Sequence, residues 1–297
     1  MTLEQLRIFV AVAEREHMTR AAEALGLVQS AVSAAIATLE NQYDTPLFHR
    51  IGRRIELTDA GRLFLIEAKA VLARAAAAEQ ALADFAGGPR GSLSVHASQT
   101  IASYWLPRHL IHFRRAYPNV DVKVAIGNTA QVADAVLAGS ADLGFVEGEI
   151  DAPTLSNQRI TGDRLAIVVG MTHPWIEKRK VEIADLADAD WVLREQGSGT
   201  RSEFEAELRR LGLDPAKLKV ALELPSNEAV RSAVVAGGGV TAISELVVEA
   251  LLRLGALYRI EIDLPARPFH VLHHRERYRS KASQALLDII ADDAPAR

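Results

Sequence analysis

Cysteine is absent from this chain of 297 residues. The absence excludes a disulfide framework, a thiolate metal site and a cysteine nucleophile. Long apolar runs are also missing, because none reaches the roughly 18 residues that a membrane-spanning helix needs. Charged side chains interrupt the first 16 residues, and no signal-peptide cleavage pattern follows them. We therefore expect a cytoplasmic protein that has no membrane partner.

The chain also lacks a strong excess of either charge. Its formal net charge is −4, and hydrophobic residues make up 49%, as is usual for a soluble globular protein. Residues 1–60 hold no lysine, six arginines and eight acidic residues, which sum to −2. Bulk charge therefore does not attract nucleic acid, although a few local donors can still contact DNA.

The first 86 residues are predicted to be almost wholly helical. An apolar stripe begins at Leu3 and recurs by three and four residues. Thr19 is placed to cap a second, short helix that Gly26 ends. A third helix follows and breaks at residues 44–46, where a proline stands.

A hairpin and a long helix are expected next. Residues 47–57 form two short alternating segments around Gly52, which indicates a hairpin. From Thr58 an alanine-rich helix is predicted to run to about residue 86. Its apolar stripe suits close pairing with a second helix, as in a coiled coil, and comprises Leu63, Ile66, Ala70, Ala73 and Ala77. The alternative is a helix that packs only on its own domain.

Residues 87–91 form the clearest boundary, and strands alternate with helices beyond it. This alternation predicts a mostly parallel sheet with helices on both faces. The segment is long for one such unit, so we expect two linked α/β lobes. The expected strands are 93–97, 120–126, 141–146 and 165–169, and the expected helices include 128–138, 201–211 and 280–290.

Several segments of the first 66 residues point to a known family. They read LEQLRIF at 3–9, TRAAEAL at 19–25, QSAVS at 29–33, PLF at 46–48 and LTDAG at 57–61. In this order they resemble the DNA-binding domain of LysR-type transcriptional regulators. The resemblance implies an all-α winged helix-turn-helix at 1–58 and a dimerising linker helix at 59–87.

The DNA contacts are expected at one end of the third helix. A recognition helix enters the major groove by its N-terminal end. Gln29, Ser30 and Ser33 lie there, and glutamine can pair with adenine while serine contacts bases or phosphates. Plain helix-surface polarity is the alternative for the serines, and a solvated turn for the hairpin arginines. The full predicted DNA-binding set is Thr19, Arg20, Gln29, Ser30, Ser33, Arg50, Arg53 and Arg54.

Two features depart from the family's pattern. Val28 stands where the family usually has Thr or Ser, so a helix cap is missing, at a cost of about 1 kcal/mol. Ala34, Ala35 and Thr38 occupy positions that are commonly basic or polar. We therefore expect modest DNA affinity that rises when two half-sites are bound together.

The second half resembles the effector-binding domain of the same family, which is similar to periplasmic binding proteins. The best segments are 127–148, 197–201 and 228–239, and the pattern is closest to the sulfur-assimilation branch. The resemblance implies a two-lobe α/β domain over 91–297. Lobe I is then expected to comprise 91–161 and 267–297, lobe II 162–266, with crossings near residues 161 and 266.

The resemblance places the effector between the lobes, at helix N-termini that follow strands. Such termini present free N–H groups and favour anions, here a small carboxylate or an oxyanion such as sulfate. N-capping alone is the alternative at each segment. The predicted effector-binding residues are Ser98, Gln99, Thr100, Asn128, Thr129, Gly197, Ser198, Gly199, Thr200 and Arg201.

No motif in the sequence indicates catalysis, a cofactor or a metal. There is no GxGxxG and no serine nucleophile motif, and His273 and His274 are expected on opposite faces of a strand. We thus expect a ligand-controlled regulator, not an enzyme. Its expected partners are double-stranded DNA at a dyad-symmetric promoter site, a small anionic effector, further copies of the chain as a dimer or tetramer, and RNA polymerase as a further candidate.

The sequence is also compatible with two other functions. The first is a small-molecule binding protein whose N-terminal helices only dimerise it, which the weakened recognition helix would favour. The second is an enzyme built on the two-lobe fold. DNA binding that depends on salt separates the regulator from the first, and turnover without DNA would identify the second.

Overall fold

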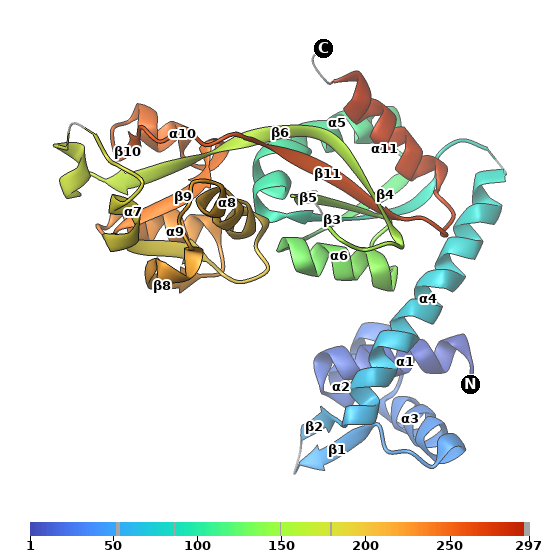
Figure 1. The fold of residues 1–297 in the computed structure, drawn as a ribbon. Helices are drawn as coiled ribbons and strands as arrows, with labels where there is room; N and C mark the ends of the chain where they lie inside the picture. The colour runs from blue at the N-terminus through green and yellow to red at the C-terminus, as the bar shows by residue number, and fades with distance from the viewer. Residues whose placement is uncertain (52–53, 86, 149, 179, 294–297) are drawn as a thin grey trace. The chain divides into compact units, whose positions relative to one another are not determined.

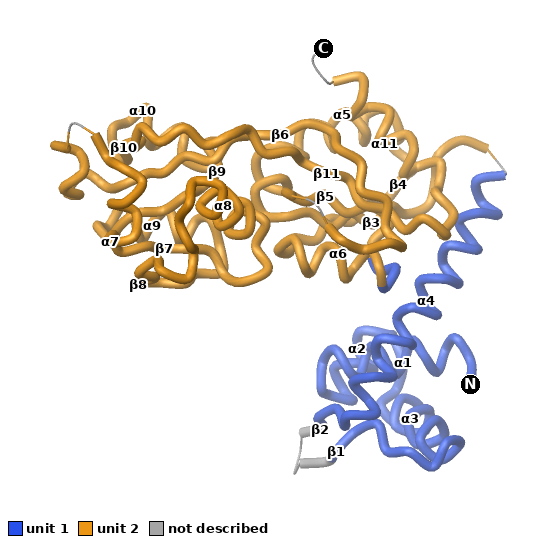
Figure 2. Tube along the Cα trace, viewed as in Figure 1, with its two compact units in different colours: residues 1–86, 138–140 blue, residues 87–137, 141–297 orange. Residues whose placement is uncertain are grey.

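The computed structural model describes residues 1–51, 54–85, 87–148, 150–178 and 180–293. It divides into two compact units, residues 1–86 with 138–140 and residues 87–137 with 141–297 (Figure 2). Within the described residues no single helix has the length and apolar character to cross a membrane. One bent pair of helices, 18–25 with 29–43, meets that test only when taken together.

The first unit contains the three predicted helices, the predicted hairpin and the long helix (Figure 1). Phe9 lies at its centre, with ring centroids 5.5 Å from Phe48 of the hairpin and 4.8 Å from Phe64 of the long helix. These contacts hold the hairpin and both helices on one core. The elements are α1 (Leu3–Arg15), α2 (Met18–Leu25), α3 (Gln29–Tyr43), β1 (Phe48–Ile51), β2 (Arg54–Leu57) and α4 (Asp59–Phe85).

The start of α2 differs from the expectation. Thr19 does not cap this helix, because the helix begins one residue earlier at Met18. His17 holds the cap position in an extended conformation, and its Nδ1 accepts the N–H of Arg20 at 3.4 Å. An imidazole nitrogen can thus replace the hydroxyl that the sequence suggested. Gly26 ends the helix in the left-handed conformation, as expected.

Helix α4 starts at a well-made cap and then carries apolar side chains on its surface. The Thr58 hydroxyl accepts the N–H of Gly61 at 2.9 Å and donates to the Pro46 carbonyl at 2.9 Å. Further along, Leu63 is 66% exposed and Ile66 59%. Both belong to the predicted stripe, so this part of the stripe is unburied within the single chain.

The second unit is an α/β domain in which a sheet is covered by helices (Figure 1). Its described strands are β3 (Gly91–Ser98), β4 (Val120–Gly127), β5 (Leu143–Glu147), β6 (Leu155–Gly170), β7 (Asp190–Arg194), β8 (Lys219–Leu224), β9 (Val240–Ser244), β10 (Leu257–Ile260) and β11 (Ala266–His274). Its α-helices are α5 (Leu106–Ala116), α6 (Thr129–Ala138), α7 (Asp185–Asp188), α8 (Gly199–Arg210), α9 (Asn227–Val235), α10 (Glu245–Arg253) and α11 (Lys281–Asp292).

The expectation of a mostly parallel sheet holds at its two sides and is wrong in the middle. The strand order is β4-β3-β5-β11-β6-β9-β7-β8, with β10 beside β6. Strand β3 pairs in parallel with β4 and β5, and β7 with β8 and β9. Strands β6 and β11 run antiparallel to each other and to their other neighbours. The reason is that these two strands carry the chain between the lobes in opposite directions.

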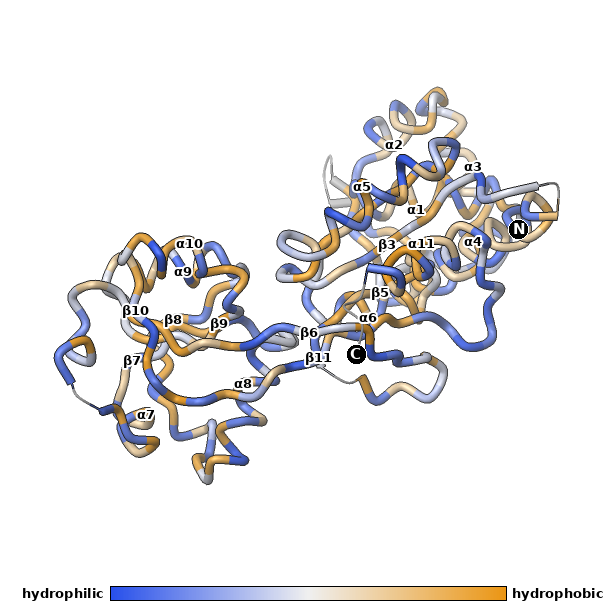
Figure 3. Tube along the Cα trace, turned by 90° about the horizontal axis from the view of Figure 1, so that it is seen from above, coloured by the Kyte–Doolittle hydropathy of each residue, from blue (hydrophilic) through white to orange (hydrophobic). Residues whose placement is uncertain are grey.

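Strands β6 and β11 join two lobes that have separate cores. Figures 1 and 3 both show these strands passing from one lobe to the other. The core of lobe I includes Phe113, Phe145 and Phe269, and that of lobe II includes Trp191 and Phe204. The crossings expected near residues 161 and 266 fall inside this pair of strands, where Phe269 pairs with Thr161 and Ala266 with Arg164.

Candidate functional site

The exposed N-terminal end of α3 carries the side chains that the sequence assigned to DNA. Gln29 and Ser30 are exposed at the first two positions of the helix, and Ser33 is half-buried one turn later. The Gln29 side-chain amide donates to the Ser33 hydroxyl at 2.9 Å. The two side chains therefore lie together at one end of the helix, which is the arrangement that major-groove contact requires.

No side chain caps this end of α3. Val28 holds the cap position, is 67% exposed and makes no cap hydrogen bond. Ala31 and Val32 donate their N–H groups to the Val28 carbonyl at 3.0 and 3.3 Å, which leaves the N–H groups of Gln29 and Ser30 at this end for a phosphate. Thr19 and Arg20 are exposed on α2. Arg53, and the side chains of Arg50 and Arg54, lie outside the described residues.

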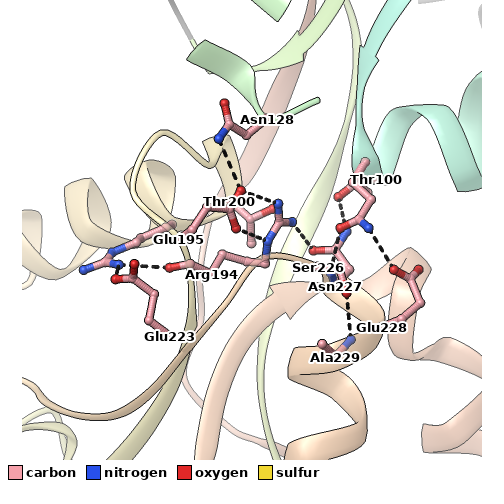
Figure 4. Close-up of polar contacts among 12 residues, drawn as sticks. Thr100, Asn128, Arg194, Glu195, Thr200, Glu223, Ser226, Asn227, Glu228 and Ala229 are labelled. Carbon is pink, nitrogen blue, oxygen red and sulfur yellow. Dashed lines mark hydrogen bonds and ion pairs between the residues drawn. The ribbon is translucent and has the colours of Figure 1, made fainter. Parts of the chain in front are cut away.

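In the second unit, the end of β3 meets the N-terminus of α9 across the two lobes (Figure 4). Gln99 accepts the backbone N–H of Asn227 at 2.6 Å and donates to the Glu228 carboxylate at 3.0 Å. The Thr100 hydroxyl accepts the Asn227 amide at 3.0 Å. Two predicted effector residues of lobe I are thus hydrogen-bonded to lobe II.

A second set of contacts continues from Asn227 to the N-terminus of α6. Arg194, at the end of β7, donates through Nη1 to the Asn227 side chain at 2.7 Å. Its Nε and Nη2 donate to the two Glu195 carboxylate oxygens at 2.8 and 2.9 Å. Glu195 in turn accepts the Asn128 side-chain amide of lobe I at 3.3 Å. Figure 4 shows this continuous network from Asn128 to Thr100.

Glu195 is held in its ionised form. Burial by itself would raise the pKa of Glu195, but the hydrogen bonds and positive charge of Arg194 outweigh burial and lower this pKa below its ordinary value. The side chain of Arg194 is 6% exposed and that of Glu195 is 23% exposed. A largely buried guanidinium and a partly exposed carboxylate therefore form a charged pair at the lobe interface.

The lobes also approach each other closely at Gly199, in the first turn of α8. A Cβ atom at this position would lie 2.4 Å from the Thr129 hydroxyl and 2.8 Å from the Glu147 carbonyl oxygen. The backbone of Gly197 also accepts the N–H of Ala130 at 3.3 Å. The predicted loop at 197–200 therefore meets the predicted Asn128–Thr129 segment.

Behind this contact a buried charge cluster ties the crossing strands to α8. Arg267 on β11 donates to the Asp163 carboxylate on β6 at 2.5 and 2.9 Å, and to the Thr200 hydroxyl at 3.1 Å. Its Nη2 also lies 3.8 Å from the Glu147 carboxylate. Burial would lower the pKa of Arg267, but these carboxylates outweigh burial and raise it. Arg267 is therefore charged and linked to both lobes.

Two buried oxygens near this interface lack a hydrogen-bond partner among the described residues. They are the Ser98 hydroxyl, at the end of β3, and Oε1 of Glu147, at the end of β5. A buried polar atom without a partner costs about 1–3 kcal/mol. The Ser98 hydroxyl therefore marks a place where an acceptor group of a small ligand would be stabilised, whereas Glu147 Oε1, 3.8 Å from Arg267 Nη2, would take only a hydrogen-bond donor.

One predicted effector residue is engaged elsewhere. Arg201 donates to Glu205 at 2.8 Å, to Glu223, and to the Arg194 carbonyl at 2.9 Å. Its guanidinium is thus held inside lobe II. The sequence favours Arg201 because this residue follows the glycine-rich segment. It does not single out Arg194, Glu195 or Asn227. Their only sequence signal is that polar residues follow an apolar strand or open a helix.

The described residues contain no group of three or more His, Cys, Asp or Glu side chains that could hold a metal ion. His273 and His274 are neighbours at the end of β11. His273 contacts the Arg279 guanidinium, and His274 accepts the N–H of Glu276 at 3.2 Å. Each ring thus has its own partner.

Two family models together match nearly the whole chain. The model of the bacterial regulatory helix-turn-helix protein, lysR family, matches residues 3–62, and that of the LysR substrate binding domain matches residues 86–295. The HTH-type transcriptional regulator YeiE of Escherichia coli strain K12 is 35% identical over 290 residues, which cover 97% of this chain and 96% of that protein.

Solved structures share the fold. Full-length CbnR complexed with its target DNA is 23% identical with a TM-score of 0.72, over 99% of this chain and all of CbnR. The CcmR regulatory domain of Synechocystis PCC6803, solved in complex with 2-PG, is 27% identical with a TM-score of 0.62. It covers 68% of this chain and 97% of the CcmR chain.

Proposed function

Because this chain belongs to the LysR family of DNA-binding transcriptional regulators, we propose that a small anion bound between its two lobes controls its regulation of transcription. The observation that carries the proposal is the hydrogen-bonded lobe interface, in which predicted effector residues of lobe I contact Glu195 and Asn227 of lobe II. A ligand can shift such an arrangement only if it binds one form more tightly than the other.

The anionic character of the effector is supported by the groups at this interface. Hydroxyls of Ser98 and Thr129, the amide of Asn128 and the N-terminus of α8 are donors that suit an oxyanion or a carboxylate. CcmR binds the small anion 2-PG in the corresponding type of domain. We propose Arg194, rather than Arg201, as the guanidinium nearest the effector, because Arg201 is held inside lobe II.

DNA recognition is proposed for the exposed N-terminal end of α3. Gln29, Ser30 and Ser33 would read bases, while Thr19, Arg20 and the hairpin arginines Arg50, Arg53 and Arg54 would contact phosphates or the minor groove. CbnR shows that a chain of this fold binds its target DNA. The proposed function includes no catalytic step. We propose that the protein acts in the cytoplasm, where the DNA is.

Self-association is proposed for the exposed apolar stripe of α4. Leu63 and Ile66 would pack against α4 of a second copy. The small alanines that follow them along the stripe would let the two helices approach closely. A two-fold dimer reads two half-sites of a dyad-symmetric promoter site, and dimers that pair further would form a tetramer. We propose RNA polymerase as a further partner of the subunits that are bound at the promoter.

Fluorescence anisotropy of the purified protein tests this proposal. The protein is titrated onto the duplex upstream of its own gene and onto a scrambled duplex, over a salt series, with and without sulfate or 2-PG. We expect preference for the native duplex, weakening as salt rises, and a change when an effective anion is added. Absence of binding to both duplexes at low salt would refute the regulator and leave a small-molecule binding protein as the better account.

A further inference from the structure

The Arg194–Glu195 pair has the geometry by which proteins recognise bound anions. Two parallel N–H donors of one guanidinium meet the two oxygens of one carboxylate at 2.8 and 2.9 Å. A ligand carboxylate, sulfate or phosphate would use the same two donors. Here the carboxylate belongs to the next residue in the chain.

Glu195 also accepts a hydrogen bond from the opposite lobe, from a donor that a bound anion would need. Its Oε1 accepts the Asn128 amide of lobe I at 3.3 Å, so the carboxylate bridges the two lobes. The residue lies in the turn that leads through Gly197, at φ +85°, to the N-terminus of α8. A guanidinium and an amide from the opposite lobe therefore hold one carboxylate of the protein itself, in the turn before α8.

The two partners differ in their freedom to move. Arg194 is 6% exposed and is fixed from a third side by Asn227 at 2.7 Å. Glu195 is 23% exposed and lies beyond the end of β7. The carboxylate can therefore turn into solvent while the guanidinium remains in place.

We infer that Glu195 is a built-in competitor for the effector's anionic group, occupying Arg194 and Asn128 until a stronger anion replaces it. This inference rests on the proposed function, since it concerns the same site. A dianionic oxyanion gains over Glu195 because it brings more charge and more acceptor oxygens to the same donors. A monocarboxylate only exchanges one carboxylate for another. Glu195 thus sets an affinity threshold that a sulfate-like or phosphate-like ligand passes more readily than a simple carboxylate does.

The test uses the full-length chain and titration calorimetry with inorganic sulfate, inorganic phosphate and acetate at constant ionic strength. Glu195→Gln keeps the shape of the side chain and removes its charge. We expect this variant to bind sulfate and phosphate on the order of tenfold more tightly than the natural chain, since one charged hydrogen-bonded competitor is lost. We also expect the affinity for acetate to rise by the same factor, because the cost of displacing Glu195 is the same for every ligand.

Glu207→Gln is the matched control, and Arg194→Lys is the complementary variant. Glu207 is 19% exposed in the same lobe and pairs with Arg210 of its own helix at 2.6 Å. Glu207→Gln should bind sulfate and phosphate with the affinity of the natural chain. Arg194→Lys keeps the charge, loses the two parallel donors and should weaken sulfate binding in both the natural and the Glu195→Gln background.

The outcomes distinguish this inference from the proposed function. Unchanged, weaker or undetectable sulfate and phosphate binding by Glu195→Gln would overturn the inference, because a residue that only orients Arg194 for the ligand would behave in that way. Tighter binding that leaves DNA affinity unaltered would support the competitor and refute effector control of DNA binding.

Discussion

Gly199 marks the point where a single added carbon would separate the lobes. Its Cβ would overlap the Thr129 hydroxyl and the Glu147 carbonyl of lobe I, at 2.4 and 2.8 Å. The Glu147 carbonyl belongs to β5 and Thr129 to the first turn of α6, so neither group can move away freely at such distances. The close approach of α8 to lobe I therefore depends on the absence of a side chain.

We expect Gly199→Ala to weaken effector binding while the chain still folds. Overpacking of this kind costs about 1–3 kcal/mol, and here the strain arises only when the lobes are closed. Sulfate or 2-PG affinity, measured by calorimetry, should fall by about tenfold or more. Gly88→Ala is the control, because a Cβ there meets nothing within 4 Å. Equal affinity in both variants would show that the lobes need not approach this closely.

His109 gives the stability of the second unit a pH dependence. The ring is 1% exposed, and burial, followed by the charge of Arg108, lowers its pKa below 6.5, with Asp293 opposing. The unfolded chain therefore takes up a proton at a higher pH than the folded chain. The stabilisation by neutral His109 is complete above about pH 6.5 and is lost as the pH falls toward the lowered folded pKa.

We expect the free energy of unfolding to decrease between pH 7 and pH 5, with a smaller decrease in His109→Phe. One proton accounts for a slope of at most about 1.4 kcal/mol per pH unit. Urea unfolding followed at several pH values measures this slope. His49→Gln, at an exposed position of the other unit, should retain the slope of the natural chain. An unchanged slope in His109→Phe would exclude His109 as its source.

At the scale of elements, the uncapped start of α3 limits the DNA-binding unit. Val28 is exposed at the cap position and leaves the first turn without a side-chain acceptor. Val28→Ser should stabilise the unit by about 1 kcal/mol, as measured caps do, and should strengthen DNA binding. Thermal unfolding and anisotropy measure the two effects. Val28→Ala removes the same exposed side chain without adding a cap, and a gain of the same size in that variant would argue against capping.

The stripe on α4 makes a separate prediction about assembly. Ile66→Glu places a charge on the exposed apolar stripe and should dissociate dimers into monomers, because a buried, unpaired charge is strongly unfavourable. Sedimentation velocity at several concentrations detects the change. Val71→Glu adds the same charge at an exposed position of the same helix outside the stripe. A dimer that survives Ile66→Glu would place the interface elsewhere.

The elements with clear local patterns were predictable from the sequence. Apolar residues spaced three and four apart identified α1, α3 and α4, Gly26 identified the end of α2, and alternation around Gly52 identified the hairpin. The cap at His17 was not predictable, because propensity favours the hydroxyl of Thr19. The direction of β6 and β11 was missed for a different reason: an apolar run is the same in a parallel and in an antiparallel strand.

The candidate site was predicted in part at the scale of the whole molecule. Segments at 98–100, 128–129 and 197–200 follow strands and open helices, so their N-termini could be located from the sequence. Arg194, Glu195 and Asn227 were missed because the folding of lobe II brings the end of β7 to the start of α9, which no local pattern in the sequence signals. Arg201 was assigned by closeness in sequence, whereas its hydrogen bonds keep it inside lobe II.

Strand β11 is the last strand in the sequence, and this position affects how the protein folds during its synthesis. This strand lies between β5 and β6 in the sheet, so lobe I has a gap at its centre until residues 266–274 have left the ribosome. The unit that reads DNA and all of lobe II emerge earlier, and domains fold as they emerge. A nascent or truncated chain that stops before residue 266 would therefore carry a folded DNA reader that no effector can control, and would expose the edge of β5 to other chains.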